Sequence, residues 1–302
     1  MAWAELTDVR AYYEVIGEGE PLLLIPGLGA TCRVWDPVTP LLAQHFSLIL
    51  VDNRDIGLSK GRRKPRTLAD YATDLVELLD VLRLDRAHVL GLSLGGIIAQ
   101  RFAVDHASRV DRLVLVSCTD KFSPYLLRMT SLLGHSLRHF PRAVFLQTME
   151  TLGTAPIYLD ENVEEIDRIT AQRCETPIPA RAMGNQLRAL LRSEMSPEDY
   201  RIVSPTLVIS GEHDCLIPSC YARMMAEKIA GSEFVLLRGA GHNPLMEVPE
   251  TAVPLIARFL LGRQWAKREA VGAGASRWTD EGGSRITVGK EGKRAKRNRR
   301  HT

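Results

Sequence analysis

The chain contains 302 residues, of which 45% are hydrophobic and 25% are charged, a composition ordinary for a globular protein with a full-sized core. Its formal net charge of +3 is unevenly spread, because residues 263–302 hold 12 of the 39 Lys/Arg and 4 of the 36 Asp/Glu, which gives +8 there and −5 elsewhere. No stretch approaches the roughly 18 consecutive apolar residues of a membrane span, and the first residues lack the basic start and apolar core of a signal peptide, so we expect a cytoplasmic protein without a transmembrane segment.

Short and mostly apolar runs recur along the chain. Runs of four to eight apolar residues are typical of strands that are buried on both faces of a parallel sheet. We predict strands at 11–15, 22–25, 47–51, 87–91, 110–116, 206–210 and 233–237.

Between most of these runs, apolar residues recur at helical spacing. Leu75, Leu78 and Leu82 mark one face of a helix predicted from about Leu68 onward, and further helices are expected after residue 93 and over 253–260. Alternating strands and amphipathic helices indicate an α/β fold, with a mostly parallel sheet flanked by helices on both sides.

The alternation stops in the middle of the chain. Residues 120–203 contain no convincing strand and several helical pieces, which are interrupted by Pro141, Pro156, Pro177, Pro179 and Pro197. We therefore predict a core formed by 1–119 and 204–262, with 120–203 inserted into it as a helical cap.

The last part of the chain, 263–302, is rich in Gly, Ser and Arg and has no hydrophobic periodicity, so we expect a basic, disordered tail. Seven basic residues lie between Lys290 and Arg300 and could contact nucleic acid or an anionic surface. Because no aromatic residue interleaves this run to stack on bases, a solvated tail is the favoured interpretation.

The segment GLSLGG, residues 91–96, crowds three glycines around Ser93 at the point where a predicted strand gives way to a predicted helix. In that context G-x-S-x-G is typical of a nucleophile elbow, a turn so sharp that only small residues fit at Gly91 and Gly95. We predict that Ser93 exposes its hydroxyl above the carboxyl ends of the strands. A tight structural turn with an incidental serine is the alternative.

A serine hydroxyl is a poor nucleophile unless a base takes its proton, and a carboxylate usually orients that base. Asp214 lies four residues beyond the run at 206–210, and His242 lies in the loop after the next run. The chain order Ser93, Asp214, His242 is the one expected for this architecture. These three residues are the predicted catalytic triad.

Two other sets of residues compete for chemical roles. Asp120 follows the run at 110–116 and could replace Asp214 as the acid. His135 and His139 have the i, i+4 spacing of a zinc pair, but no carboxylate or cysteine joins them nearby, so a packing or surface role is favoured.

The five cysteines are odd in number, and no pair has the spacing of a zinc or redox motif. We therefore predict free thiols in a reducing compartment, and we expect neither a metal nor a cofactor.

A tetrahedral intermediate needs two N–H donors directed at its oxyanion. The N–H of Leu94, directly after the serine, is the first candidate. The second is the N–H of Leu28 in the segment PGLGA, which follows the strand predicted at 22–25. An ordinary turn is the alternative explanation of the glycines in that segment.

The segments IPGLGA, VDNRDIGLS, GLSLGG, SGEHDCLIP and GAGHNPLMEVPE together resemble the α/β-hydrolase family, over residues 10–262. Within it, the chain is most similar to small capped cytoplasmic esterases and lactonases, including the 3-oxoadipate enol-lactonases. The resemblance implies a helical lid, which fits 120–203. Serine at position 93 argues against the haloalkane dehalogenases and epoxide hydrolases of this fold, which use aspartate there.

Two positions depart from the pattern of that family. Asp55 replaces the first glycine of D-x-R-G-x-G-x-S, and a loop salt bridge with Arg54 is one interpretation of the extra carboxylate. Pro26 stands where many relatives have a histidine before the glycine.

These features predict a serine hydrolase that cleaves small carboxylic esters or lactones through an acyl-enzyme intermediate. The alternatives are an acyltransferase or C–C bond hydrolase with the same triad, and a slow-turnover receptor for a small ligand.

An adaptable apolar pocket in the cap could be lined by Met129, Met149, Met183 and Met195, and core packing explains these methionines equally well. For Trp35, core packing and a place beside the pocket are both open.

Overall fold

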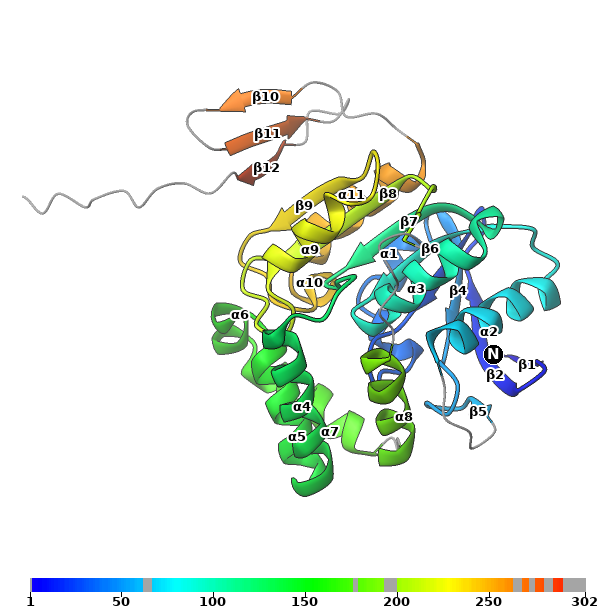
Figure 1. Ribbon diagram of the computed structural model, residues 1–302. Helices are drawn as coiled ribbons and strands as arrows, with labels where there is room; N and C mark the ends of the chain where they lie inside the picture. Colours follow the sequence, from blue (N-terminus) through cyan, green and yellow to red (C-terminus); the bar gives the residue numbers. More distant parts are fainter. Residues whose placement is uncertain are drawn as a thin grey trace, which may run out of the picture. The chain divides into compact units, whose positions relative to one another are not determined.

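The computed structural model describes residues 2–61, 67–175, 179–192 and 200–262, together with the backbone of 268–271, 275–279 and 285–289 (Figure 1). The chain divides into two units, Met1–Leu261 and Gly262–Thr302. None of the described helices has the length and apolar character needed to cross a bilayer.

The first unit contains strands β1 to β9 and helices α1 to α11, with two short 3-10 helices. The strands are β1 (Ala2–Glu5), β2 (Val9–Ile16), β3 (Glu20–Ile25), β4 (Phe46–Val51), β5 (Lys60–Gly61), β6 (Ala87–Leu92), β7 (Val110–Val116), β8 (Thr206–Gly211) and β9 (Glu233–Leu237). The helices are η1 (Cys32–Trp35), α1 (Thr39–Leu42), α2 (Leu68–Val81), α3 (Leu94–Asp105), η2 (Ala107–Arg109), α4 (Pro124–His139), α5 (Arg142–Gly153), α6 (Pro156–Glu161), α7 (Val163–Glu175), α8 (Ala180–Leu191), α9 (Ser219–Ala226), α10 (Pro244–Glu247) and α11 (Pro249–Leu260).

Within the described part of this unit, the strands form one nine-stranded sheet in the order β1-β2-β4-β3-β6-β7-β8-β9, with β5 paired to β2. β1 and β2 pair antiparallel with their neighbours, and the strands from β4 to β9 along the sheet pair in parallel. The chain leaves β3 toward β4 and leaves β6 toward β7, in opposite directions along the sheet. Open α/β sheets bind ligands beside the carboxyl ends of strands at such a point.

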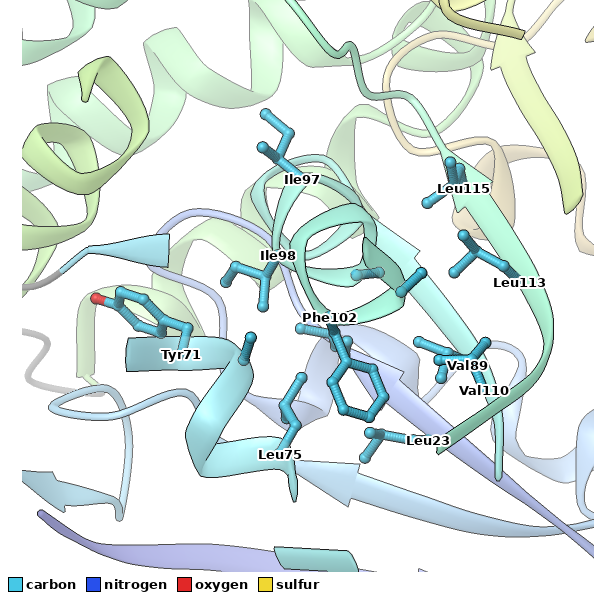
Figure 2. Packing of buried hydrophobic residues seen from close by; sticks show 14 of the residues in the cluster. Leu23, Tyr71, Leu75, Val89, Ile97, Ile98, Phe102, Val110, Leu113 and Leu115 are labelled. Atoms are coloured by element: carbon cyan, nitrogen blue, oxygen red, sulfur yellow. The ribbon is translucent and has the colours of Figure 1, made fainter. Parts of the chain in front are cut away.

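Strand residues alternate between the two faces of the sheet. Leu23 and Val89 belong to a buried cluster that also contains apolar residues of α2, α3 and α9. Figure 2 shows Phe102 of α3 between these strand residues and Leu75 of α2. Leu22, on the opposite face, is also fully buried, because α1 and α11 cover that side (Figure 1). The predicted α/β fold with helices on both sides of the sheet is confirmed.

Helix α2 begins where the sequence predicts it and has a local reason to begin there. The Thr67 hydroxyl accepts a hydrogen bond from the Asp70 N–H, and the Asp70 carboxylate accepts one from the Thr67 N–H at 2.7 Å. This reciprocal capping satisfies donors that the first helical turn leaves unpaired. Leu75 and Leu78 on the predicted apolar face are buried.

The segment predicted as a cap contains helices α4 to α8 and no strand among its described residues. Phe145 of α5 and Met183 of α8 form a buried cluster with Ile56, which lies in the loop after β4. The cap helices therefore pack on the sheet unit through a shared apolar contact. The boundaries drawn between core and cap at 119 and 204 remain predictions.

The second unit contains three short strands in its described backbone: β10 (Arg268–Val271), β11 (Ala275–Thr279) and β12 (Arg285–Gly289), paired antiparallel in that order. We expected no regular structure there, but RITVG in β12 alternates apolar and polar residues, which is typical of a strand. The rest of 263–302, including the basic run from Lys290 to Arg300, lies outside the described residues.

Substitution of Gly95 should destabilise the protein, because α3 approaches β3 most closely at this residue. A Cβ placed on Gly95 would lie 1.9 Å from the Ile25 carbonyl oxygen, so we expect Gly95→Ala to lower the free energy of unfolding by about 3 kcal/mol. Gly184 in α8 has no atom within 4 Å of such a Cβ, and Gly184→Ala should raise stability by about 0.5–1 kcal/mol. Chemical denaturation measures the free energy of unfolding of both variants. A Gly95→Ala variant as stable as Gly184→Ala would contradict the close packing of α3 against β3.

Candidate active site

Ser93 lies between β6 and α3 with a backbone conformation that is rare for a residue other than glycine, at φ 54° and ψ −119°. Its N–H donates to the Val116 carbonyl oxygen at 2.8 Å, which anchors the turn to β7. A Cβ on Gly91 would lie 2.4 Å from the Gly95 carbonyl oxygen, so the flanking glycines are sterically required. Strain held by such contacts is found mainly at functional sites.

The loop after β3 lies against this serine. β3 and β6 pair in parallel with Ile25 opposite Gly91, so the residues that follow the two strands leave the sheet side by side. A Cβ on Gly27 would lie 3.4 Å from Ser93 Cβ and 3.9 Å from its Oγ. A side chain at position 27 would therefore be in van der Waals contact with the serine side chain, so the loop lies directly beside Ser93.

Asp214 and His242 meet at the same edge of the sheet, after β8 and β9. His242 Nδ1 lies 2.8 Å from Asp214 Oδ2, and the Asp214 side chain has no exposed area. Its other oxygen, Oδ1, accepts the N–H groups of Leu216 at 2.9 Å and Ile217 at 2.8 Å. The carboxylate is thus held in place by backbone donors on one side and by the imidazole on the other.

The surroundings of His242 shift its pKa upward. Burial alone would lower the pKa of His242, but the charge and the hydrogen bond of Asp214 outweigh burial and raise it above its ordinary value. The carboxylates of Glu247 and Glu150 act in the same direction. The imidazole is therefore a stronger base than a histidine in water.

Ser93 and His242 line one cavity of about 100 Å³, together with Leu28 and several cap residues. Among the described hydrogen bonds none joins Ser93 Oγ to the imidazole, although both residues line this cavity. Such contacts are often long in the absence of substrate and shorten when it binds. The structure therefore brings the three predicted triad residues to one site.

A larger cavity of about 250 Å³ lies in the cap, against Gly29 of the loop after β3. Its walls are mostly apolar and include Phe145, Leu146 and Met183, and Arg173 borders both cavities. The size and the apolar walls of this space suit an apolar ligand group.

Two of the four methionines considered for an apolar pocket do line a cavity: Met183 lines the cavity in the cap, and Met149 lines the cavity at Ser93. Met129 does not contribute to the described walls of either cavity, and Met195 lies outside the described residues. Trp35 is fully buried, as expected for core packing.

The competing residues are placed elsewhere. The Asp120 carboxylate forms an ion pair with Lys228, whereas Asp214 contacts the imidazole. The rings of His135 and His139 lie 4.3 Å apart on α4, but no group of three or more potential metal ligands occurs in the described ranges.

Among the ion pairs of the described residues none joins Asp55 to Arg54, so Arg54 is the wrong partner for it. Arg54 instead pairs with both carboxylate oxygens of Asp74, which lies on α2. Asp55 has a φ of 65°, a left-handed conformation that glycine adopts freely and aspartate tolerates. Its Oδ1 accepts the Gly61 N–H at 2.9 Å. This hydrogen bond helps to hold the loop in its conformation although position 55 is not a glycine.

Glu247 is a buried residue near the site that the sequence analysis missed. Its Oε2 accepts the N–H groups of Ala155 at 2.9 Å and Gly241 at 2.8 Å, and its Oε1 accepts that of Asn243 at 3.3 Å. Burial raises the pKa of Glu247. The carboxyl group joins the loop of His242 to the cap, and the only sequence signal for it is its place five residues after His242.

The chain matches the model of the alpha/beta hydrolase family over residues 22–254. An uncharacterized protein of Mycobacterium tuberculosis (strain ATCC 25618 / H37Rv) is 30% identical over 83% of this chain and 78% of its own length. A putative carbamate hydrolase of Caulobacter sp. (strain K31) is 28% identical over 83% and 96%. The crystal structure of the enol-lactonase from Burkholderia xenovorans LB400 superposes with a TM-score of 0.78 at 23% identity, covering 86% of this chain and all of that one. The fold that the sequence resemblance implied is confirmed, and the chain belongs to the alpha/beta hydrolase family.

Proposed function

We propose that this protein is a serine hydrolase that cleaves carboxylic esters or lactones through an acyl-enzyme intermediate. The observation that carries the proposal is the buried Asp214–His242 pair, whose imidazole shares a cavity with Ser93 at a strained strand-to-helix turn. Without that pair, the elbow would be an unusual turn with no base to activate its hydroxyl.

In the first half of the reaction, Ser93 Oγ attacks the carbonyl carbon while His242 Nε2 takes its proton. Asp214 accepts a hydrogen bond from Nδ1–H, which leaves the lone pair of Nε2 directed to the cavity and stabilises the imidazolium that forms. The protonated imidazole then gives its proton to the leaving alkoxide, and an ester of Ser93 remains. In the second half, His242 takes a proton from water while the water oxygen attacks the acyl carbon. The imidazolium then returns this proton to Ser93 Oγ as the bond to the acyl carbon breaks, and the acid is released.

The negative charge that develops on the carbonyl oxygen needs two donors. We assign this role to the backbone N–H groups of Leu94 and Leu28. Leu94 is the first residue of α3, where the helix dipole adds to the attraction, and Leu28 lines the cavity of the serine. Loss of one such donor typically costs about 10²–10³-fold in kcat.

The relatives support acyl chemistry more than any particular substrate. A carbamate, the substrate class printed in the name of several relatives, presents an acyl carbon to a nucleophile as an ester does. The nucleophile, base and oxyanion donors proposed here could act on either class. The cap cavity of about 250 Å³ would hold the apolar part of the substrate.

The reaction should fail at acid pH, because only the neutral imidazole can take the serine proton. Since the pKa of His242 lies above its ordinary value, we expect kcat/KM to fall as the pH drops through a midpoint above about 6.5. Glu150→Gln removes one of the charges that raise this pKa and should move the midpoint down slightly. A wild-type midpoint below 6 would contradict the assignment of His242 as the base.

A product assay separates hydrolysis from its alternatives. Purified protein is incubated with p-nitrophenyl esters of increasing acyl length and with an enol-lactone, with and without an added alcohol acceptor. The proposal predicts release of the free acid in both conditions. A transfer product that dominates at low acceptor concentration would identify an acyltransferase, and thermal stabilisation by a ligand without any product would identify a receptor.

A further inference from the structure

We propose that Gln186, on cap helix α8, is a positioning residue for the oxyanion hole: its side-chain oxygen holds the Gly29 N–H and thereby fixes the loop that carries the Leu28 N–H. The cap would then complete the catalytic site as well as cover it. This inference rests on the serine-hydrolase function proposed above.

The contact between α8 and the loop is direct and buried. Gln186 Oε1 accepts the Gly29 N–H at 2.8 Å, although 157 residues separate the two in the chain. Gln186 has no exposed area, so the hydrogen bond is shielded from bulk water. Met183, one turn earlier on α8, packs on the same glycine, where a Cβ would lie 2.7 Å from its terminal methyl group.

A second amide side chain holds the same loop from the sheet side. Asn53, which is buried after β4, donates from Nδ2 to the Pro26 carbonyl oxygen at 3.0 Å. The peptide that bears the Leu28 N–H therefore lies between two anchored peptides, one held by the core and one held by the cap.

The loop around Leu28 is a β-turn, and turns of this kind occur in two forms. The Ala30 N–H donates to the Gly27 carbonyl oxygen at 3.2 Å, and Gly29 has a φ of +62°. A left-handed third residue is typical of a type II turn, which differs from type I by a flip of its middle peptide. That peptide joins Leu28 to Gly29, and its N–H is the group that Gln186 binds.

Removal of the Gln186 oxygen would leave a buried N–H without an acceptor, which costs more than a lost hydrogen bond at the surface. Since glycine adopts either form of the turn, the middle peptide could flip, and the adjacent peptide that bears the Leu28 N–H would then lose its anchor on the cap side. The transition state would lose part of its charge stabilisation, while binding of the uncharged substrate would change little.

The test compares Gln186→Met, which keeps the length of the side chain but removes the amide oxygen, with Gln186→Glu, which keeps an acceptor oxygen at the same place. We expect Gln186→Met to lower kcat at least tenfold, with KM changed less than twofold. The rate constant for phosphonylation of Ser93 by a fluorophosphonate should fall by a similar factor, because that reaction also develops charge on an oxygen in the hole. Gln186→Glu should restore kcat to within about threefold of the wild type.

Asn185→Leu is the matched control, since Asn185 is a buried amide on the same helix that bonds to Arg188 and makes no described contact with the loop. It should leave kcat and phosphonylation within twofold of the wild type. Where Gln186→Met does not fold, Gln186→Leu takes its place. Amide hydrogen exchange at Gly29 in the wild type is an independent readout, and we expect it to be slow.

The outcomes distinguish this inference from the function on which it rests. Ester hydrolysis that survives Ser93→Ala would overturn the proposed function. Hydrolysis that requires Ser93 but is unaffected by Gln186→Met, or affected only in KM, would overturn the role of Gln186 alone. Fast exchange of the Gly29 amide in the wild type would overturn it as well, whatever the activity.

Discussion

Ser93→Ala is expected to reduce kcat for ester hydrolysis by roughly 10⁴–10⁶-fold, because alanine lacks the hydroxyl that forms the acyl-enzyme. The backbone strain at this position is the same for alanine as for serine, since both carry a Cβ at a φ of 54°. The variant should therefore melt within a few degrees of the wild type. Turnover of a p-nitrophenyl ester and circular-dichroism melting measure the two expectations.

Ser117 provides a matched control for this substitution. It follows β7, is fully buried and has a positive φ of 49°, so it resembles Ser93 in backbone strain and in its place at the end of a strand. Its hydroxyl makes no hydrogen bond within the described structure and lines neither of the two cavities. Ser117→Ala should leave kcat within about twofold of the wild type. A large loss of kcat in this variant would mean that removal of any strained serine lowers activity, and the loss in Ser93→Ala would then not identify the nucleophile.

Asp214→Asn is the second change with a large expected effect, a fall of about 10⁴-fold in kcat. An amide at this position can still occupy the space of the carboxylate and accept the N–H groups of Leu216 and Ile217. However, it cannot stabilise the imidazolium, and its NH₂ group can donate to Nδ1 and select the tautomer with the proton on Nε2. That tautomer has no lone pair for the serine proton.

Asp120→Asn separates the two candidate acids. It weakens the ion pair with Lys228 but changes no contact of His242, so kcat should remain within about threefold of the wild type. The reverse pattern, in which Asp120→Asn abolishes turnover and Asp214→Asn does not, would assign the acid to the end of β7.

Much of the fold and the centre of the site could be predicted because their signals are local. The strands β3, β4, β6 and β7 appear as short apolar runs, and the elbow at Ser93 appears as glycines at fixed offsets from one serine. Asp214 and His242 could be placed because parallel strands deliver their following loops to one edge of the sheet.

The remaining features depend on contacts between distant segments. Gln186 resembles any amide on an amphipathic helix until α8 is packed against the loop at Gly29. Glu247 follows His242 closely, but its partner Ala155 lies in the cap, 92 residues away. The carboxylate of Asp55 suggested an ion pair, and only the left-handed backbone shows why it bonds to the Gly61 N–H instead.

The central claim is that a covalent ester of Ser93 forms during turnover, and trapping that ester tests it most directly. The protein is mixed with an excess of a p-nitrophenyl ester at a pH near or above the pKa of His242, where the imidazole can activate Ser93. Samples are denatured in acid at a series of short times and digested for mass spectrometry. The account predicts the mass of one acyl group on the peptide that contains Ser93, and its absence in Ser93→Ala. An acyl group on another residue, or a wild-type enzyme that turns over with Ser93 unmodified at every time point, would contradict it.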